Sequence, residues 1–237
     1  MMKKTFLLTF TCAAALMLSA CQTTSTSHNG RHSLAHKGAP TVDTAIQRAA
    51  HIATQQGAAK EGLVFYEQLY RRNPQDIETV LHYTTALRKD GQAKKAKIIL
   101  QGWNENKTSR DVMVALAQTH LSLGEFEQAL PLAERAVDMR ESDAVAQHIY
   151  GLTLDALGYH GQAEGHLKQA LENWQGDPVK VLNNLALNLS AQQKKAEALD
   201  IIDKALIFDP YNKHLHNNRA LIAALRTTPK PGSKPNG

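Results

Sequence analysis

The chain has 237 residues and a mass of 26.1 kDa, enough for one or two ordinary domains. A hydrophobic content of 43% with 21% charged residues is typical of a packed soluble protein and excludes both a polytopic membrane protein and a wholly disordered chain. The formal net charge of +5 is modest, only 5% of residues are aromatic and there are only two cysteines, which argues against a nucleic-acid-binding protein and a cysteine-rich metal or disulfide framework.

The first 20 residues have the pattern of an export signal. A short positive segment with Lys3 and Lys4 precedes residues 5–20, which carry no charge and end in small residues. An uncharged run of this length is short for a transmembrane helix, which needs about 20 apolar residues. If the segment is cleaved, the net charge of the mature chain falls to +3, because 25 basic and 22 acidic side chains remain.

Residues 18–21, Leu-Ser-Ala-Cys, resemble the bacterial lipobox, in which the cysteine thiol receives a diacylglycerol before cleavage. The resemblance implies that Cys21 becomes the lipidated first residue, and two or three acyl chains there would anchor the protein permanently. The next residue is Gln22 and not Asp, which by resemblance to lipoproteins of double-membraned bacteria permits sorting to the outer membrane, so we expect the domain to face the periplasm. The alternative is an ordinary secreted protein with a cysteine at this position by chance.

Residues 21–40 are expected to hold the lipidated cysteine and a flexible tether, because they are rich in Thr, Ser, His and Gly. His28, His32 and His36 recur every four residues, a spacing that would bind metal on a helix, but nothing else there favours helix, so we expect a solvated tether. Residues 227–237, with three prolines, are expected to be a disordered tail.

Residues 41–226 contain a repeat. Four glycines lie 33 or 34 residues apart, at Gly57, Gly91, Gly124 and Gly158. A small residue follows each of them by five positions, and apolar residues at helical spacing flank each glycine. The pattern predicts a helical hairpin in each unit: the glycine supplies unusual backbone angles between the helices, and the small residue lets them pack closely.

This pattern resembles the tetratricopeptide repeat (TPR), which implies an all-α, right-handed superhelix of about five helix pairs plus a capping helix at residues 213–226. The repeats are expected at residues 43–76, 77–109, 110–143, 144–178 and 179–212. The best matches are residues 123–130 and 186–210. Two features depart from the family pattern: non-aromatic residues stand early in the first helices, and Gln193 occupies the glycine position of the fifth repeat.

The sequence contains no phosphate-binding loop, no metal-binding His-Glu-x-x-His and no Gly-x-Ser-x-Gly nucleophile motif. We therefore expect a non-enzymatic protein without cofactor or metal. Surface-facing positions of the first helices are instead expected to form a mixed groove for a protein or peptide partner, with apolar anchors between amides. These candidates are His51, Leu81, Thr85, Arg88, Val114, Gln118, Leu121, His148, Leu152, Asp155, Asn183, Leu187, Asn217 and Leu221.

Residues 151–164 and 181–190 look like the tetratricopeptide lipoproteins of tight-adherence (Tad/Flp) pilus assembly, the TadD family. The resemblance covers the whole chain and implies a pilotin or assembly factor that binds the Tad secretin or other pilus-assembly components. Two alternatives share the anchor and the repeats: a lipoprotein like the pilotin of type IVa pili, and a general periplasmic TPR lipoprotein of envelope or peptidoglycan assembly.

Overall fold

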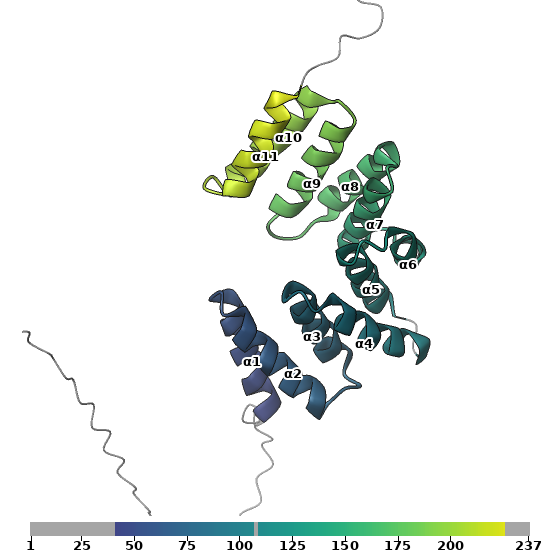
Figure 1. The fold of residues 1–237 in the computed structure, drawn as a ribbon, viewed down its shortest axis with the longest axis vertical. Coiled ribbons are helices and arrows are strands. Elements are labelled where there is room, and N and C mark those ends of the chain that lie inside the picture. Colours follow the sequence, from purple (N-terminus) through teal and green to yellow (C-terminus); the bar gives the residue numbers. More distant parts are fainter. Residues whose placement is uncertain (1–40, 107–108, 226–237) are drawn as a thin grey trace, which may run out of the picture. The chain divides into compact units, whose positions relative to one another are not determined.

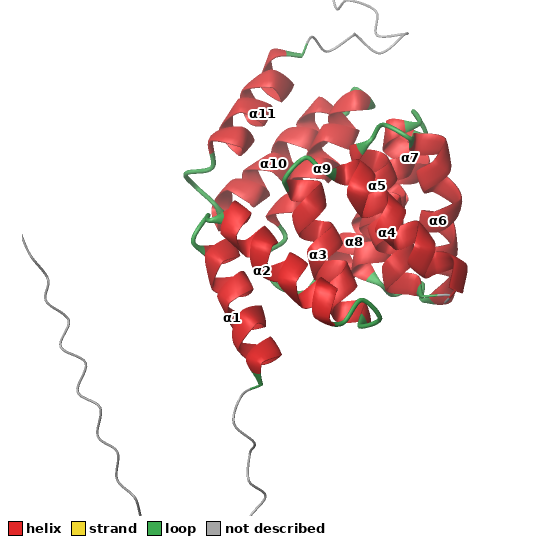
Figure 2. Cartoon of the chain, turned by 60° about the horizontal axis from the view of Figure 1, so that its bottom comes forward, coloured by secondary structure: helices red, strands yellow, loops and turns green. Residues whose placement is uncertain are grey.

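The computed structural model describes residues 41–106 and 109–225, and all the regular secondary structure in these residues is α-helical (Figure 2). The predicted signal peptide, Cys21, the tether with its three histidines and the C-terminal tail lie outside the described residues.

The described residues form five consecutive helix pairs and a final single helix (Figure 1). The helices are α1 (Val42–Gln55), α2 (Ala59–Arg72), α3 (Ile77–Lys89), α4 (Ala93–Asn106), α5 (Arg110–Ser122), α6 (Phe126–Met139), α7 (Ala144–Ala156), α8 (His160–Asn173), α9 (Val179–Ala191), α10 (Lys195–Phe208) and α11 (Lys213–Ala224). Each predicted repeat range contains one pair, so the predicted all-α helix-pair architecture is confirmed. The last helix ends at Ala224, slightly before the predicted end.

The turn inside each pair depends on one residue in the left-handed backbone region. The four periodic glycines have φ angles between 72° and 83°, a range that costs a residue with a Cβ atom about 1–2 kcal/mol. Gln193 adopts the same conformation in the fifth pair, with φ of 62°. The turn ends the first helix because its N–H groups donate hydrogen bonds to the last free carbonyls of that helix. In the second pair, for example, the N–H of Gln92 donates to the carbonyl of Leu87 at 2.8 Å.

The small residues five positions later lie where the two helices of a pair touch. Ala96, Ala129, Ala163 and Ala198 are fully buried. In the first pair, a Cβ atom added to Gly62 would lie 2.6 Å from the Oγ1 atom of Thr54. The small residues of the sequence pattern therefore lie at close contacts between paired helices.

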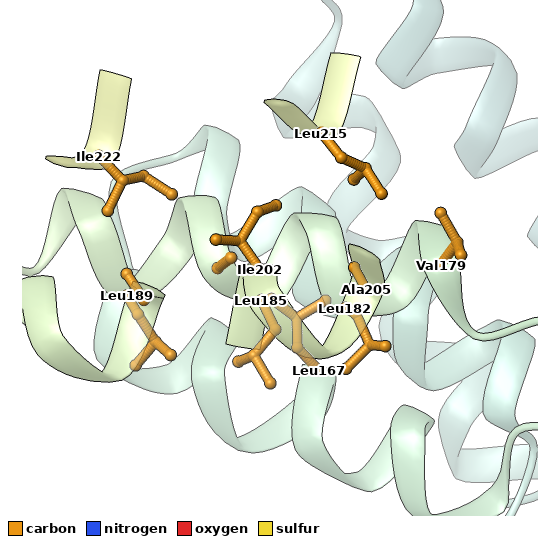
Figure 3. Packing of buried hydrophobic residues seen from close by; sticks show 11 residues of the cluster. Leu167, Val179, Leu182, Leu185, Leu189, Ile202, Ala205, Leu215 and Ile222 are labelled. Carbon is orange, nitrogen blue, oxygen red and sulfur yellow. The ribbon is translucent and has the colours of Figure 1, made fainter. Parts of the chain in front are cut away.

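The core continues along the chain as clusters that join neighbouring units. Figure 3 shows one cluster, in which side chains of α8, α9, α10 and α11 interdigitate, with Leu185 and Ile202 at most 1% exposed. From α3 onward, each first helix also packs against the next first helix: α3 on α5, α5 on α7, α7 on α9 and α9 on α11. The exception is α1, which has no Cα atom within 8 Å of α3.

Candidate partner-binding surface

The structure leaves most of the predicted groove residues at least partly accessible. His51, Leu187, Asn217 and Leu221 are exposed. Half-buried positions are Leu81, Thr85, Arg88, Gln118, Leu121, Leu152, Asp155 and Asn183. The two others, Val114 and His148, differ from the expectation of an open surface, because their side chains are 8% and 7% exposed.

His148 is buried between α7 and α9. Its Nε2 atom lies 2.9 Å from the Nδ2 atom of Asn184, and the ring of Trp174 packs edge-on against it with centroids 5.6 Å apart. Burial lowers the pKa of His148 to about 4, and the nearby Lys180 contributes to the same shift. His148 is therefore neutral at pH 7 and belongs to the packing between repeats.

Four predicted groove residues meet around one cavity. Leu81 and Thr85 of α3 and Val114 and Gln118 of α5 line a cavity of about 290 Å³. An ion pair closes its edge, because the Nη1 atom of Arg110 lies 3.0 Å from the Oδ2 atom of Asp143 at the start of α7. Val114, although largely buried, thus contributes an apolar wall to a recess that an apolar side chain of a partner could enter.

Arg88 lies beside this cavity. Its Nη2 atom donates to the Oε1 atom of Gln118 at 3.3 Å, and no carboxylate of the described residues forms an ion pair with it. Burial lowers the pKa of Arg88, which nevertheless stays charged because guanidinium is protonated throughout the usual pH range. Because its hydrogen-bond partner is the neutral amide of Gln118, Arg88 places a positive charge beside the cavity that no carboxylate of the described residues neutralises through an ion pair.

Polar side chains also connect α7, α9 and α11. Asp155 accepts a hydrogen bond from the Nδ2 atom of Asn188 at 2.6 Å, and the Nδ1 atom of His160 lies 2.7 Å from the same carboxylate oxygen. Farther along, the Nδ2 atom of Asn218 donates to the Oδ1 atom of Asn183 at 2.8 Å. Asp155 and Asn183 thus hold adjacent repeats together, which limits what they offer to a partner.

A charged cluster next to Asn188 joins α8 to the turn between α9 and α10. The carboxylate of Glu164 lies 2.6 Å from the Nζ atom of Lys168 and 2.5 Å from that of Lys194, and it accepts from Gln192 at 3.0 Å. These donors lower the pKa of Glu164 to about 2. The groove prediction did not include this cluster, its neighbour Asn188 or the His148 partner Asn184, although Asn184, Asn188 and Gln192 recur every four residues.

A larger cavity, which the repeat pattern did not predict, lies between α1, α2 and α3, where the backbones of α1 and α3 do not pack closely. It measures about 630 Å³. Tyr66 and His82 stack on its wall with ring centroids 5.3 Å apart, and Gln47 bridges it by donating to Glu78 at 2.9 Å. His51, a predicted groove residue, also lines this cavity.

The described residues contain no group of three or more His, Cys, Asp or Glu side chains placed to hold a metal ion. Within the same residues, no helix is both long and apolar enough to cross a bilayer. The arrangement of apolar recesses, amides and isolated cations is suited to contact with another protein chain.

The fold and this surface define a helical-repeat scaffold suited to protein–protein binding. The tetratricopeptide repeat profiles match residues 41–176 and 180–208, and the first match alone spans more than half of the chain. The chain therefore belongs to the tetratricopeptide repeat family. TPR proteins are generally non-enzymatic scaffolds, and the fold suits protein or peptide partners.

Solved structures show the same fold. The chain is similar to a thermophilic TPR protein of Thermus thermophilus, with a TM-score of 0.70 and 23% identity, over 78% of this chain and 100% of that one. It also resembles YrrB, a TPR protein with an unusual peptide-binding site, with a TM-score of 0.51 and 18% identity over 74% of this chain and 90% of that one. The match to a chain of the APC/C hetero-tetramer Cut9-Hcn1 has a TM-score of 0.68 and 13% identity, over 76% of this chain and 36% of that one. A search of curated proteins gave no match.

Proposed function

We propose that the protein is a lipid-anchored scaffold of the outer membrane that assists assembly of a Tad/Flp pilus, as a pilotin or assembly factor for the secretin. The observation that carries the proposal is the combination, in one chain, of a lipobox ending at Cys21 with a TPR domain. Acylation at Cys21 would hold the domain at the membrane, and the spacer before residue 41 would keep it clear of the headgroups.

The surface between α3, α5 and α7 supports a role in binding rather than in chemistry. Apolar recesses next to amides and a lone guanidinium suit a peptide whose side chains enter pockets while its backbone bonds to side-chain amides. The similarity to YrrB, whose peptide-binding site gives that protein its description, is consistent with such a role. The resemblance of residues 151–164 and 181–190 to the TadD family favours the pilus over other envelope machines.

The test is chemical crosslinking in intact cells followed by purification from membranes and mass spectrometry of the accompanying proteins. We expect the secretin of a tight-adherence system, or another component of that system, as the main partner. Enrichment of type IVa pilus proteins or of peptidoglycan enzymes instead would assign the scaffold to another machine. Genes for a tight-adherence ATPase, secretin and prepilin beside the gene for this chain would give independent support.

A further inference from the structure

Three leucines occupy equivalent positions on α7, α9 and α11 and form what we call the leucine row: Leu152, Leu187 and Leu221. Leu187 is 39% exposed and Leu221 is 66% exposed, whereas Leu152 is half-buried. The opposite side of α9 faces the core: Leu185 and Leu189 are each 1% exposed and point into the cluster of Figure 3. Leu152 also packs against the core cluster of α5, α6 and α7, whereas Leu187 and Leu221 are apolar surface that the fold leaves exposed.

Hydrogen bonds between the helices place these leucines side by side. His148 of α7 bonds to Asn184 of α9, 36 residues later, and Asn183 of α9 bonds to Asn218 of α11, 35 residues later. The members of the leucine row have nearly the same separation in sequence. They lie on helices that pack directly against each other, so the row is continuous across three repeats.

The charged side chains on α9 and α11 themselves are all basic. Helices α9 and α11 contain no Asp or Glu but carry Lys180, Lys213 and Arg219. Arg219 is neutralised by Asp203 of α10, with its Nε atom 2.5 Å from the carboxylate. Lys180 and Lys213 are exposed and form no ion pair with any residue in the described ranges.

The carboxylates at the borders of these helices accept hydrogen bonds from local side chains and backbone. Asp155 at the end of α7 is bonded to Asn188 and His160. Asp177, just before α9, accepts from the N–H of Val179 at 2.9 Å, and Asp209, before α11, accepts from Asn212 at 2.8 Å. These carboxylates keep their charge, but none of them forms an ion pair with Lys180 or Lys213, so within the described residues the two lysines offer exposed, unpaired positive charges along one side of the apolar row.

We propose that the leucine row with Lys180 and Lys213 is a docking site for an acidic, leucine-rich segment of a partner protein. Apolar side chains of that segment would cover Leu187 and Leu221, and its carboxylates would face the two lysines. Charge complementarity selects such a segment over a basic one, because like charges across an interface oppose binding. The proposal names the partner chemistry for the scaffold proposed above, yet it stands on this surface alone.

The test is selection of short random peptides displayed on phage against the detergent-solubilised full chain. We expect the enriched peptides to combine Asp or Glu with Leu or Phe and to bind more weakly at high salt. Lys180→Glu should weaken them by about tenfold or more, and peptides in which the acids are replaced by lysine should regain affinity for this variant. Leu221→Glu should abolish binding.

Matched controls separate this site from a general effect of charge or apolar exposure. Lys94→Glu on α4 makes the same change of charge at another exposed lysine. Val64→Glu on α2 places a carboxylate at a side chain 62% exposed, close to the value for Leu221. Both controls should bind the selected peptides like the wild type.

Several results would overturn the proposal: no enriched peptides, enrichment of basic peptides, or equal loss in the controls. It fails equally if Lys180→Glu and Leu221→Glu instead disrupt binding to phosphatidylglycerol vesicles, or self-association measured by ultracentrifugation, while peptides stay bound. Because the assay uses purified protein, its failure is distinct from failure of the pilus role, which the membrane crosslinking tests. A positive selection would stand even if crosslinking identified another envelope machine.

Discussion

Gln193 reproduces, with φ of 62°, the left-handed turn that Gly158 makes with φ of 83° one repeat earlier. Both residues close the first helix of their pair in the same way: the N–H of Lys194 donates to Leu189, and the N–H of Tyr159 donates to Leu154. The turn is thus imposed by the packing of the pair, and glycine is only the least strained residue for it.

Replacing Gln193 with glycine should therefore stabilise the protein. Removing the strain of a left-handed residue raises the free energy of unfolding by about 1 kcal/mol. The greater conformational entropy of glycine in the unfolded chain offsets part of this gain. The reciprocal change, Gly158→Gln, meets no atom within 4 Å of its new Cβ and should destabilise by about 1–2 kcal/mol through backbone strain alone. Urea denaturation followed by circular dichroism measures both, and changes of the same sign in the two variants would contradict this account.

Close packing between paired helices gives a second prediction. Ala163 and Ala198 are fully buried where α8 and α10 meet their partners. Substituting either by Phe should destabilise by about 1–3 kcal/mol, because the helices must separate to admit the ring. Far-ultraviolet circular dichroism should stay helical while the Tm falls. A wild-type Tm in both variants would show that the pairs do not pack through these positions.

Buried histidines predict how stability changes with acid. The folded-state pKa of His148, about 4, lies below its ordinary value of 6.5, so only the unfolded chain takes up this proton between these pH values. The contribution of His148 to the free energy of unfolding is therefore fully present above pH 6.5. It declines by about 3 kcal/mol in all as the pH falls toward 4. Burial also lowers the pKa of His166, which adds to the same trend.

Urea denaturation at pH 7 and at pH 4.5 measures this loss. His148→Gln removes the titrating group and should lose less stability over that interval than the wild type, while His166 keeps part of the slope. Glu164 acts in a different window: its pKa is lowered to about 2, so its contribution is lost only as the pH falls from about 4.5 toward 2. Equal acid sensitivity of the variant and the wild type would exclude His148 as the cause.

The sequence predicted the fold well because the repeat constrains backbone and packing at fixed intervals. The left-handed turns and the small residues each recur once per pair, so the repeat ranges and the turn inside each pair followed from residues such as Gly91 and Ala129 without knowledge of distant contacts. The surface was harder to predict. Assigning one face of each first helix identified Leu187 as exposed but also included His148, which Trp174 and Asn184 of later segments cover.

The cavity beside α1 could not be predicted for a related reason. A repeat pattern implies that every first helix packs on the next, yet α1 has no Cα atom within 8 Å of α3 and reaches it through the Gln47–Glu78 hydrogen bond. The residues that line the gap, among them Tyr66 and His82, lie on both helices of the first pair and on the second pair. Only the three-dimensional packing brings them to one place.

Membrane attachment gives a prediction outside the described residues. Cys21→Ser should release the protein from the membrane fraction or leave it as an uncleaved precursor, because a hydroxyl does not accept the diacylglycerol. Fractionation followed by immunoblotting measures this, and labelling with a fatty-acid analogue should disappear in parallel. If the variant fractionates and labels like the wild type, the protein is not a lipoprotein anchored at this residue.

The last prediction concerns pilus assembly in cells. Asn183 and Leu187 lie four residues apart on α9, on the side opposite its core leucines, so one double variant alters a single patch. Asn183→Ala combined with Leu187→Glu should abolish partner capture and surface piliation. A carboxylate buried against an apolar partner costs several kcal/mol, on the order of half the binding free energy of a micromolar contact. The variant should remain helical and membrane-bound, since Leu187 is exposed and the side chain of Asn183 makes only two hydrogen bonds within the described residues, with Asn218 and Asn184.

The control places two changes on the second helix of the preceding pair. Lys168→Ala with Gln169→Ala alters exposed side chains of α8, and Glu164 keeps Lys194 and Gln192 as partners, so the protein should fold and assemble pili normally. Electron microscopy of surface pili and copurification of the crosslinked partner measure both variants. If the α9 variant still assembles pili while the α8 control fails, the partner binds the second helices and the proposed surface is on the wrong side of the repeats.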